Sequence, residues 1–230
     1  MKEIVGGSIY FGFFLTIGAY YIGLRVKKRL NLGIFNPLLI AILLVMGVLV
    51  VTGIGYEDYQ QGGRFVSDLL TPATVCLAIP LYKQLHLLKK HGLAVAVGIT
   101  SGVMTSAVCI FVFCKLFRLG HEHYVTLLPK SITTAIGMGV SEEAGGIVTL
   151  TVISIVITGI VGNMCAEMLC RLAKIIHPVA KGLAIGTSAH ALGTAKALEL
   201  GEIEGAMSSL SIAVAGLMTV IVVPLVSGLI

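Results

Sequence analysis

Residues 183–199, which read LAIGTSAHALGTAKALE, hold the side chains of this chain whose types and spacing could do chemistry. Three ionisable groups, His190, Lys196 and Glu199, lie there among small residues, in a chain that is otherwise strongly apolar. Ionisable groups at membrane depth cost a few kcal/mol each, so they usually mark the path of a substrate or an ion. A helix broken by glycine is tolerated at that depth only where it lines a cavity inside the protein. The segment therefore predicts one half of a solute-binding site.

The composition of the chain indicates an integral membrane protein. Of its 230 residues, 57% are hydrophobic and only 12% are charged, whereas a soluble domain has about 25% charged residues. The formal charge of +5 comes from basic residues in short loops, which is typical of membrane topology and predicts no nucleic-acid partner. The five cysteines lie in apolar runs without C-x-x-C spacing, so we expect no disulfide framework, metal site or cofactor. A single membrane domain over residues 1–230 is the simplest organisation.

Apolar runs of about 20 residues, the length that crosses a bilayer, define the predicted spans. The clear candidates are residues 4–24, 34–54, 93–117, 144–172 and 206–230. The first of them has no small-residue cleavage site after it, so it is predicted to be a span and not a signal peptide. A sixth candidate, 68–88, contains Pro72 and Pro80, which should bend or break a helix.

Two further segments, residues 124–143 and 181–204, fit poorly as spans. Each has a polar beginning, a middle of small residues and an acidic end. The predicted fold is therefore an all-α polytopic membrane protein with about six full spans and two re-entrant or broken hairpins. Its parts are four spans over 4–117, a hairpin plus span over 124–172, and an inverted hairpin plus span over 181–230.

The distribution of basic residues favours the re-entrant interpretation of both segments. Cytoplasmic loops carry an excess of Lys and Arg. This rule predicts that two basic loops lie inside. One contains Arg25, Lys27, Lys28 and Arg29, and the other contains Lys83, Lys89 and Lys90. The loop between them, with Glu57, Asp58 and Arg64, is then predicted outside. If 124–143 dips into the membrane and returns, Arg171, Lys174 and Lys181 also lie inside, whereas a full crossing would place them outside. Lys115 and Arg118 remain as exceptions on the outer side.

An internal repeat relates the two segments. Aligning Thr134 with Thr194 also aligns identical residues at Ala135 and Ala195, Glu142 and Glu202, Gly145 and Gly205, and Leu150 and Leu210. Lys130 then corresponds to His190. Coincidence among small residues is the alternative explanation. Inverted repeats whose broken helices meet near the membrane midplane are a recurring transporter plan, and the basic residues predict that same inversion.

The two hairpins could bind a small anion. Half-helices that end inside the membrane direct free N–H groups and the positive end of the helix dipole at a cavity. The candidate substrate-binding residues are Lys130, Ser131, Thr133, Thr134, Thr187, Ser188, His190, Thr194 and Lys196. Hydroxyl donors with basic groups suit a small carboxylate better than a metal cation.

Ordinary structural roles compete with each of these assignments. Ser and Thr commonly join helices in membranes, and Lys130 could extend to the interface. His190 is either a proton carrier or a packing residue. The acidic residues are expected to favour helix N-termini; they are Glu142, Glu143, Glu202 and Glu204.

Enzymatic function is not expected. Ser188 and His190 are two residues apart, which turns them to different faces of a helix. The chain has no G-x-S-x-G or H-E-x-x-H motif and no paired intramembrane aspartates.

Three separated runs, in the same order, resemble the motifs of the LrgB/CidB family of membrane proteins. They are LTPATVCLAIPLYKQ at 70–84, LPKSITTAI at 128–136 and GTSAHALGTAK at 186–196, and Asn36-Pro37 fits as well. The resemblance covers nearly the whole chain. It implies a multi-pass protein of the bacterial inner membrane, usually paired with a smaller LrgA/CidA-like membrane protein.

The resemblance implies two kinds of function. Family members are described as holin-like or antiholin-like modulators of murein hydrolase activity and lysis, while plastid relatives exchange glycolate and glycerate and some bacterial members serve pyruvate uptake. This chain departs from the family at Ala135, where Pro is frequent, and at Lys196, where Arg is frequent. The second change keeps the charge but loses a bidentate fork for a carboxylate.

Two hypotheses follow from the sequence. The leading one is a carrier for small monocarboxylates such as pyruvate, glycolate or glycerate, bound between the two hairpins. The alternative is a holin-like or antiholin-like assembly that regulates murein hydrolase export and cell lysis. It predicts large homo-oligomers, and the 28 glycines of the chain would permit close helix contacts in them.

Overall fold

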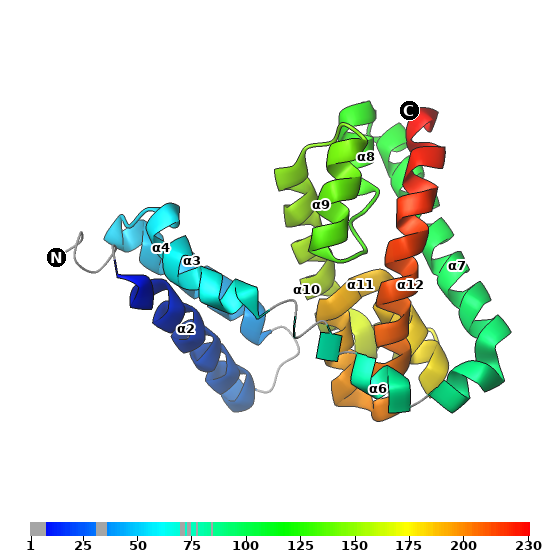
Figure 1. Cartoon of the computed structure of the whole chain (residues 1–230), viewed down its shortest axis with the longest axis horizontal. Coiled ribbons are helices and arrows are strands. Elements are labelled where there is room, and N and C mark those ends of the chain that lie inside the picture. The colour runs from blue at the N-terminus through cyan, green and yellow to red at the C-terminus, as the bar shows by residue number, and fades with distance from the viewer. Residues whose placement is uncertain (1–7, 31–35, 70–71, 73–74, 77, 84) are drawn as a thin grey trace. The chain divides into compact units, whose positions relative to one another are not determined.

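A computed structural model provides the structure of the chain (Figure 1). It describes residues 8–30, 36–69, 72, 75–76, 78–83 and 85–230. The chain divides into two compact units, Met1–Cys76 and Leu77–Ile230, and each is described by itself. Within the described ranges every regular element is a helix, so the all-α prediction is confirmed.

Three helices of the first unit lie wholly within the described residues. They are α2 (Ile9–Leu30), α3 (Pro37–Thr52) and α4 (Tyr56–Asp68). The side chain of Asn36 accepts a hydrogen bond from the amide of Leu38 at 2.8 Å and caps α3. The helix ends at Gly53, whose φ of 65° is the left-handed conformation that glycine adopts most easily.

The segment with Glu57, Asp58 and Arg64, which the sequence analysis treats as a loop, forms helix α4. Its acidic residues, Glu57 and Asp58, lie in the first turn, where they interact favourably with the helix dipole. A Cβ atom on Gly12 of α2 would lie 2.1 Å from the carbonyl oxygen of Tyr59 and 2.8 Å from the amide of Gly63. The backbones of α2 and α4 therefore approach closely, and this long-range packing stabilises a helix that lacks the apolar run of a span.

The second unit carries the polar segments that the sequence singles out. Its elements are α6 (Ala78–Lys83), α7 (Leu85–Leu116), α8 (His121–Leu127), α9 (Thr134–Glu143), α10 (Val148–Leu172), α11 (Pro178–Leu200), α12 (Glu202–Val226) and the 3₁₀ helix Ser227–Leu229.

Three helices of the described chain are long and apolar enough to cross a membrane, judged by length and composition. They are Lys89–Leu116, Val148–Leu172 and Glu202–Leu229, and they match the predicted spans 93–117, 144–172 and 206–230. The predicted total of about six spans is not confirmed. Helix α3 is apolar but only 16 residues long, and the predicted spans 4–24, 34–54 and 68–88 lie partly outside the described residues.

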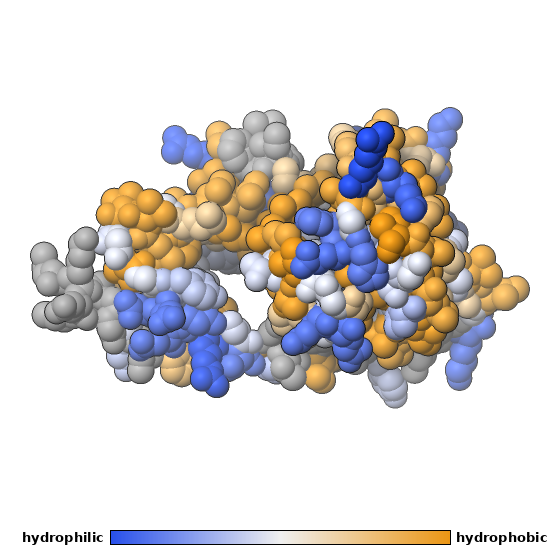
Figure 2. Space-filling model, turned by 90° about the horizontal axis from the view of Figure 1, so that it is seen from above, coloured by the Kyte–Doolittle hydropathy of each residue, from blue (hydrophilic) through white to orange (hydrophobic). Residues whose placement is uncertain are grey.

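Apolar side chains form much of the outer surface. Figure 2 shows hydrophobic residues covering large areas of the visible face, with hydrophilic residues gathered in patches. On the long helices, Leu93 is 82% exposed and Leu225 is 76% exposed. Exposed apolar surface of this extent is typical of a protein surrounded by lipid, as the composition predicts.

Residues 124–143 form a broken hairpin, as predicted. Helix α8 ends at Leu127, a turn follows, and α9 begins at Thr134. The hydroxyl of Thr126 accepts a hydrogen bond from the amide of Ile147 at 2.8 Å, and its carbonyl accepts one from Thr151 at 3.0 Å. The end of α8 thus lies beside the start of α10, and α9 returns between them.

The predicted break in the second polar segment is also present. Ala189 (φ −130°, ψ 15°) and His190 (φ 41°, ψ −140°) leave the helical conformation inside α11. In the half before the break, a Cβ atom on Gly182 would lie 2.5 Å from the carbonyl oxygen of Glu204, and one on Gly186 would lie 2.5 Å from that of Ser208. This half therefore runs in the same direction as α12.

The half of α11 after the break runs the opposite way. Thr194 hydrogen bonds to Ser208 at 2.6 Å, and a Cβ atom on Gly205 would lie 2.3 Å from the side chain of Leu198. Residues later in this half contact residues earlier in α12, so this half runs antiparallel to α12. The two halves of α11 therefore form a hairpin.

Within the second unit, the two hairpins are joined to opposite ends of α10. The first connects the end of α7 to the start of α10, and the second connects the end of α10 to the start of α12. At one end, the Nδ1 atom of His121 lies 2.9 Å from the carbonyl oxygen of Ile230, and Figure 1 shows α8 near the C-terminus. At the other end, the ring of His177 contacts that of His91.

Candidate functional site

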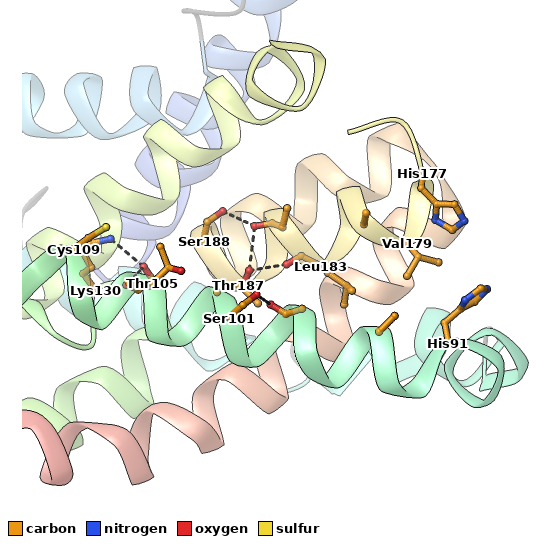
Figure 3. Close-up of a pocket in the computed structure, with 17 residues that line it drawn as sticks. His91, Ser101, Thr105, Cys109, Lys130, His177, Val179, Leu183, Thr187 and Ser188 are labelled. Carbon is orange, nitrogen blue, oxygen red and sulfur yellow. Dashed lines mark hydrogen bonds between the residues drawn. The ribbon is translucent and has the colours of Figure 1, made fainter. Parts of the chain in front are cut away.

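A cavity of about 650 Å³ lies between α7, the tip of the first hairpin and the first half of α11 (Figure 3). Its lining residues are His91, Ala94, Gly98, Ser101, Gly102, Thr105, Ser106, Cys109, Lys130, Ser131, His177, Val179, Ala180, Leu183, Ala184, Thr187 and Ser188. A smaller void of about 10 Å³ is lined by Ser106, Ser131, Thr187 and Thr219 together with apolar residues. The tips of both hairpins therefore meet beside the middle of α7.

Helix α7 lines the cavity with a stripe of small and polar residues. Gly98, Ser101, Gly102, Thr105, Ser106 and Cys109 all face it. Their spacing of three and four residues places them on one face of a helix. A Cβ atom on Gly102 would lie 3.0 Å from the side chain of Thr187, so glycine permits the close approach of α11. The sequence interpretation missed this stripe, although its helical spacing within an apolar span is a readable signal.

The first hairpin contributes the cationic group of the cavity interior. The Nζ atom of Lys130 donates a hydrogen bond to Oγ of Ser131 at 3.1 Å, and Ser131 Oγ lies 3.4 Å from Ser106 Oγ. Lys130 is half-buried. Among the ion pairs of the described residues none involves Lys130, and no Asp or Glu lines the cavity. The ammonium group is thus free to pair with an anionic solute.

The second hairpin contributes two hydroxyl groups. Thr187 donates to the carbonyl of Leu183 and Ser188 donates to that of Ala184, each at 2.7 Å. Both hydroxyl hydrogens are thus engaged by backbone carbonyls of their own helix. Because a hydroxyl hydrogen rotates to suit its partner, either group can redirect its donor to a bound carboxylate.

Four of the nine predicted site residues line the cavity, namely Lys130, Ser131, Thr187 and Ser188. The other five do not. Thr133 and Thr134 begin α9. Lys196 pairs with Glu199 at 3.1 Å and Glu167 at 3.7 Å, because its place on the second half of α11 turns it toward α10.

His190 is buried and points away from the cavity. Its Nε2 atom lies 2.9 Å from the carbonyl oxygen of Ile155, and its residue is only 4% exposed. A Cβ atom on Gly159 would lie 2.7 Å from the imidazole ring. The aligned residues Lys130 and His190 therefore both lie at chain reversals, but their side chains face different surroundings.

Polar contacts from α10 and α12 satisfy the opened backbone at this break. The side chain of Asn163 donates to the carbonyl of Leu192 at 2.7 Å. The hydroxyl of Thr194 is within 3.0 Å of the carbonyl of His190 and 2.6 Å of the hydroxyl of Ser208. Buried backbone groups need such partners in an apolar surrounding, so Thr194 holds the hairpin and does not contact the cavity.

We expect Thr194→Val to destabilise the second hairpin by about 1 kcal/mol, the usual size of a hydrogen bond between membrane helices. Thr194 and Ser208 are both buried, so valine leaves the serine hydroxyl without its partner. Thermal unfolding of the purified protein in detergent measures the change. The double variant Thr194→Val/Ser208→Ala should cost less than the sum of the single variants, and additive costs would contradict a direct interaction.

The fold and the cavity together define a helical membrane protein in which two broken hairpins meet at a polar site. No Asp or Glu among the described residues lines this site. The chain belongs to the LrgB-like family, whose model matches residues 16–229. This confirms the resemblance found in the sequence.

Named relatives cover nearly the whole chain. It is 38% identical over 210 residues to the "Holin-like protein CidB" of Staphylococcus epidermidis (strain RP62A), covering 91% of this chain and 92% of that protein. It is 37% identical over 217 residues to the "Antiholin-like protein LrgB" of Bacillus cereus (strain B4264), covering 94% of each. No solved structure matches the chain. The bacterial relatives and the apolar helices indicate a membrane protein.

Proposed function

We propose that this chain moves small monocarboxylates, of the size of pyruvate, glycolate or glycerate, across the bacterial inner membrane without catalysis. The observation that carries the proposal is the cavity between the hairpin tips, which contains Lys130 and no carboxylate residue among its lining. A half-buried cation without a counter-ion among the described residues favours an anionic ligand. The hydroxyls of Ser131, Thr187 and Ser188 add hydrogen-bonding groups that fit carboxylate oxygens.

The names of the relatives favour a second candidate, a holin-like or antiholin-like role. We propose that such a role would modulate murein hydrolase activity and lysis. Of the two functions, this is the one that the comparisons support better. Names of this kind describe a cellular effect, so both candidates can be one activity if carboxylate movement triggers or restrains lysis. A smaller LrgA/CidA-like membrane protein and further copies of this chain are the proposed partners.

The arrangement of the hairpins suits alternating access. The order short helix, break, short helix, long helix occurs twice, in α8–α9–α10 and in the two halves of α11 with α12. We propose that these are inverted repeats that move against each other around the cavity. The basic residues near the start of α11, Lys174 and Lys181, support a cytoplasmic position for the end of the cavity at His91 and His177. At the other end, Leu128, Tyr124 and Val223 pack in one apolar cluster, which would close the outer path.

Reconstitution in liposomes tests the proposal and separates the two candidates. Vesicles would contain the purified chain, alone or with its smaller partner, and a trapped fluorescent dye. A carrier gives labelled-pyruvate uptake that saturates with concentration while the dye is retained. Uptake that is linear in concentration, accompanied by loss of dye and by large oligomers, would reject the carrier and support a holin-like pore.

A further inference from the structure

Two histidines lie at the end of the cavity opposite Lys130 (Figure 3). His91 comes from α7 and His177 from the residue before α11, and their ring centroids are 5.9 Å apart in an edge-to-face arrangement. Both residues line the cavity. The folding of the unit thus joins two imidazoles that are distant in the sequence.

Neither histidine is engaged in the way a packing histidine usually is. His190 and His121 each hydrogen bond to a backbone carbonyl. The imidazoles of His91 and His177 instead contact each other, and among the described residues no side-chain hydrogen bond or ion pair engages either ring. Their ring nitrogens remain available to a solute in the cavity.

The local backbone presents both rings to the cavity. His91 departs from helical geometry (φ −115°, ψ 20°) inside α7, at a position that Gly92 follows. His177 has extended geometry and its side chain does not cap α11. Departures from regular backbone are often retained at binding sites.

Charged side chains also lie on helices α6, α7, α11 and α12, which contact one another, but these side chains do not line the cavity. They include Lys83 on α6, Lys89 and Lys90 on α7, Lys181 on α11, and Glu202 and Glu204 on α12. Inside the cavity the other titratable groups are Cys109 and Lys130. Since no carboxylate lines the cavity, an anion brought to the histidines meets no competing acidic side chain there.

We propose that His91 and His177 form an entry site for a small carboxylate, which binds when at least one imidazole is protonated and then passes to Lys130. The site rests on the proposed movement of monocarboxylates, but its binding reaction can be measured separately. Imidazole gains its charge between about pH 8 and pH 5, so capture of the anion should increase over that range.

Pyruvate binding to the purified full-length protein in detergent tests the site, because pyruvate remains ionised over this range. Calorimetric titrations would be made at pH 8 and pH 5.5. We expect wild-type affinity to rise roughly fivefold or more on acidification, as the imidazoles charge. In the double variant His91→Gln/His177→Gln, the ratio of the two affinities should fall to about one.

Control variants separate this site from other effects of pH. His123→Gln changes an exposed histidine outside the cavity lining and should keep the wild-type ratio. Lys130→Ala should lower affinity at both pH values and keep the pH ratio. A wild-type protein without pH dependence, or a double variant with the wild-type ratio, overturns the entry site. If the pH-dependent binding depends on the pair but liposomes show no saturable uptake, the site stands and the carrier function fails.

Discussion

Replacing Lys130 with alanine is expected to weaken pyruvate binding by roughly ten- to hundredfold, the loss of one charge-assisted hydrogen bond of about 1.5–3 kcal/mol. The ammonium group lies at the meeting point of the hairpin tips, held by Ser131 and without a protein counter-ion among the described residues. Its removal takes the positive charge from the cavity interior. Saturable uptake into liposomes should therefore nearly disappear.

Two matched variants control this experiment. Lys130→Arg keeps the charge but exchanges a compact ammonium for a larger planar group, so we expect partial uptake. Lys115→Ala removes an exposed lysine of α7 that lies outside the cavity lining, and uptake should equal that of the wild type. If Lys130→Ala retained full uptake with unchanged concentration dependence, the cavity would not be the substrate path.

Replacing Gly186 with valine is expected to have the largest effect on the stability of the second unit. A Cβ atom there would lie 2.5 Å from the carbonyl oxygen of Ser208 and 2.7 Å from Cβ of Ser211. Because one of these atoms belongs to the backbone of α12, a side chain at position 186 can be accommodated only if the first half of α11 moves away from α12. We expect a cost of about 3 kcal/mol or more, at the upper end for overpacked cores, and a fall in the melting temperature of roughly 6–12 °C.

Gly139→Ala provides the control for this substitution. Gly139 lies inside α9 with no atom within 4 Å of its added Cβ, and alanine favours a helix over glycine by about 1 kcal/mol. The melting temperature in detergent should stay the same or rise. A Gly186→Val protein that melts like the wild type would show that α11 and α12 do not pack as described.

The sequence predicted both helix breaks and the three long apolar helices of the second unit correctly. These features have local causes. A span is visible as an uninterrupted apolar run, and a break is visible where small and polar residues interrupt one. Helix α4 was missed because its stability comes from close packing against Gly12 of α2, which is a contact between residues far apart in the chain.

The site was predicted less completely than the fold. Lys130 and Ser131 on one hairpin and Thr187 and Ser188 on the other do line a common cavity. His190 lies at the break in α11 and Thr194 follows it, but their side chains turn toward Ile155 and Ser208. The chain changes direction at Ala189 and His190. Helical periodicity before that point therefore does not predict where the side chains after it point.

Composition and motifs alone thus determined that this chain is a helical membrane protein of the LrgB-like family with two interrupted segments. Only tertiary structure decided which polar groups share a cavity, and it added the α7 stripe and the histidine pair of His91 and His177. Cavity lining depends on how helices rotate and approach one another, which Gly102 and Gly186 permit through contacts with distant residues. If Lys130 proves to face lipid, or if the two hairpin tips are found apart, no shared pocket for an anion exists.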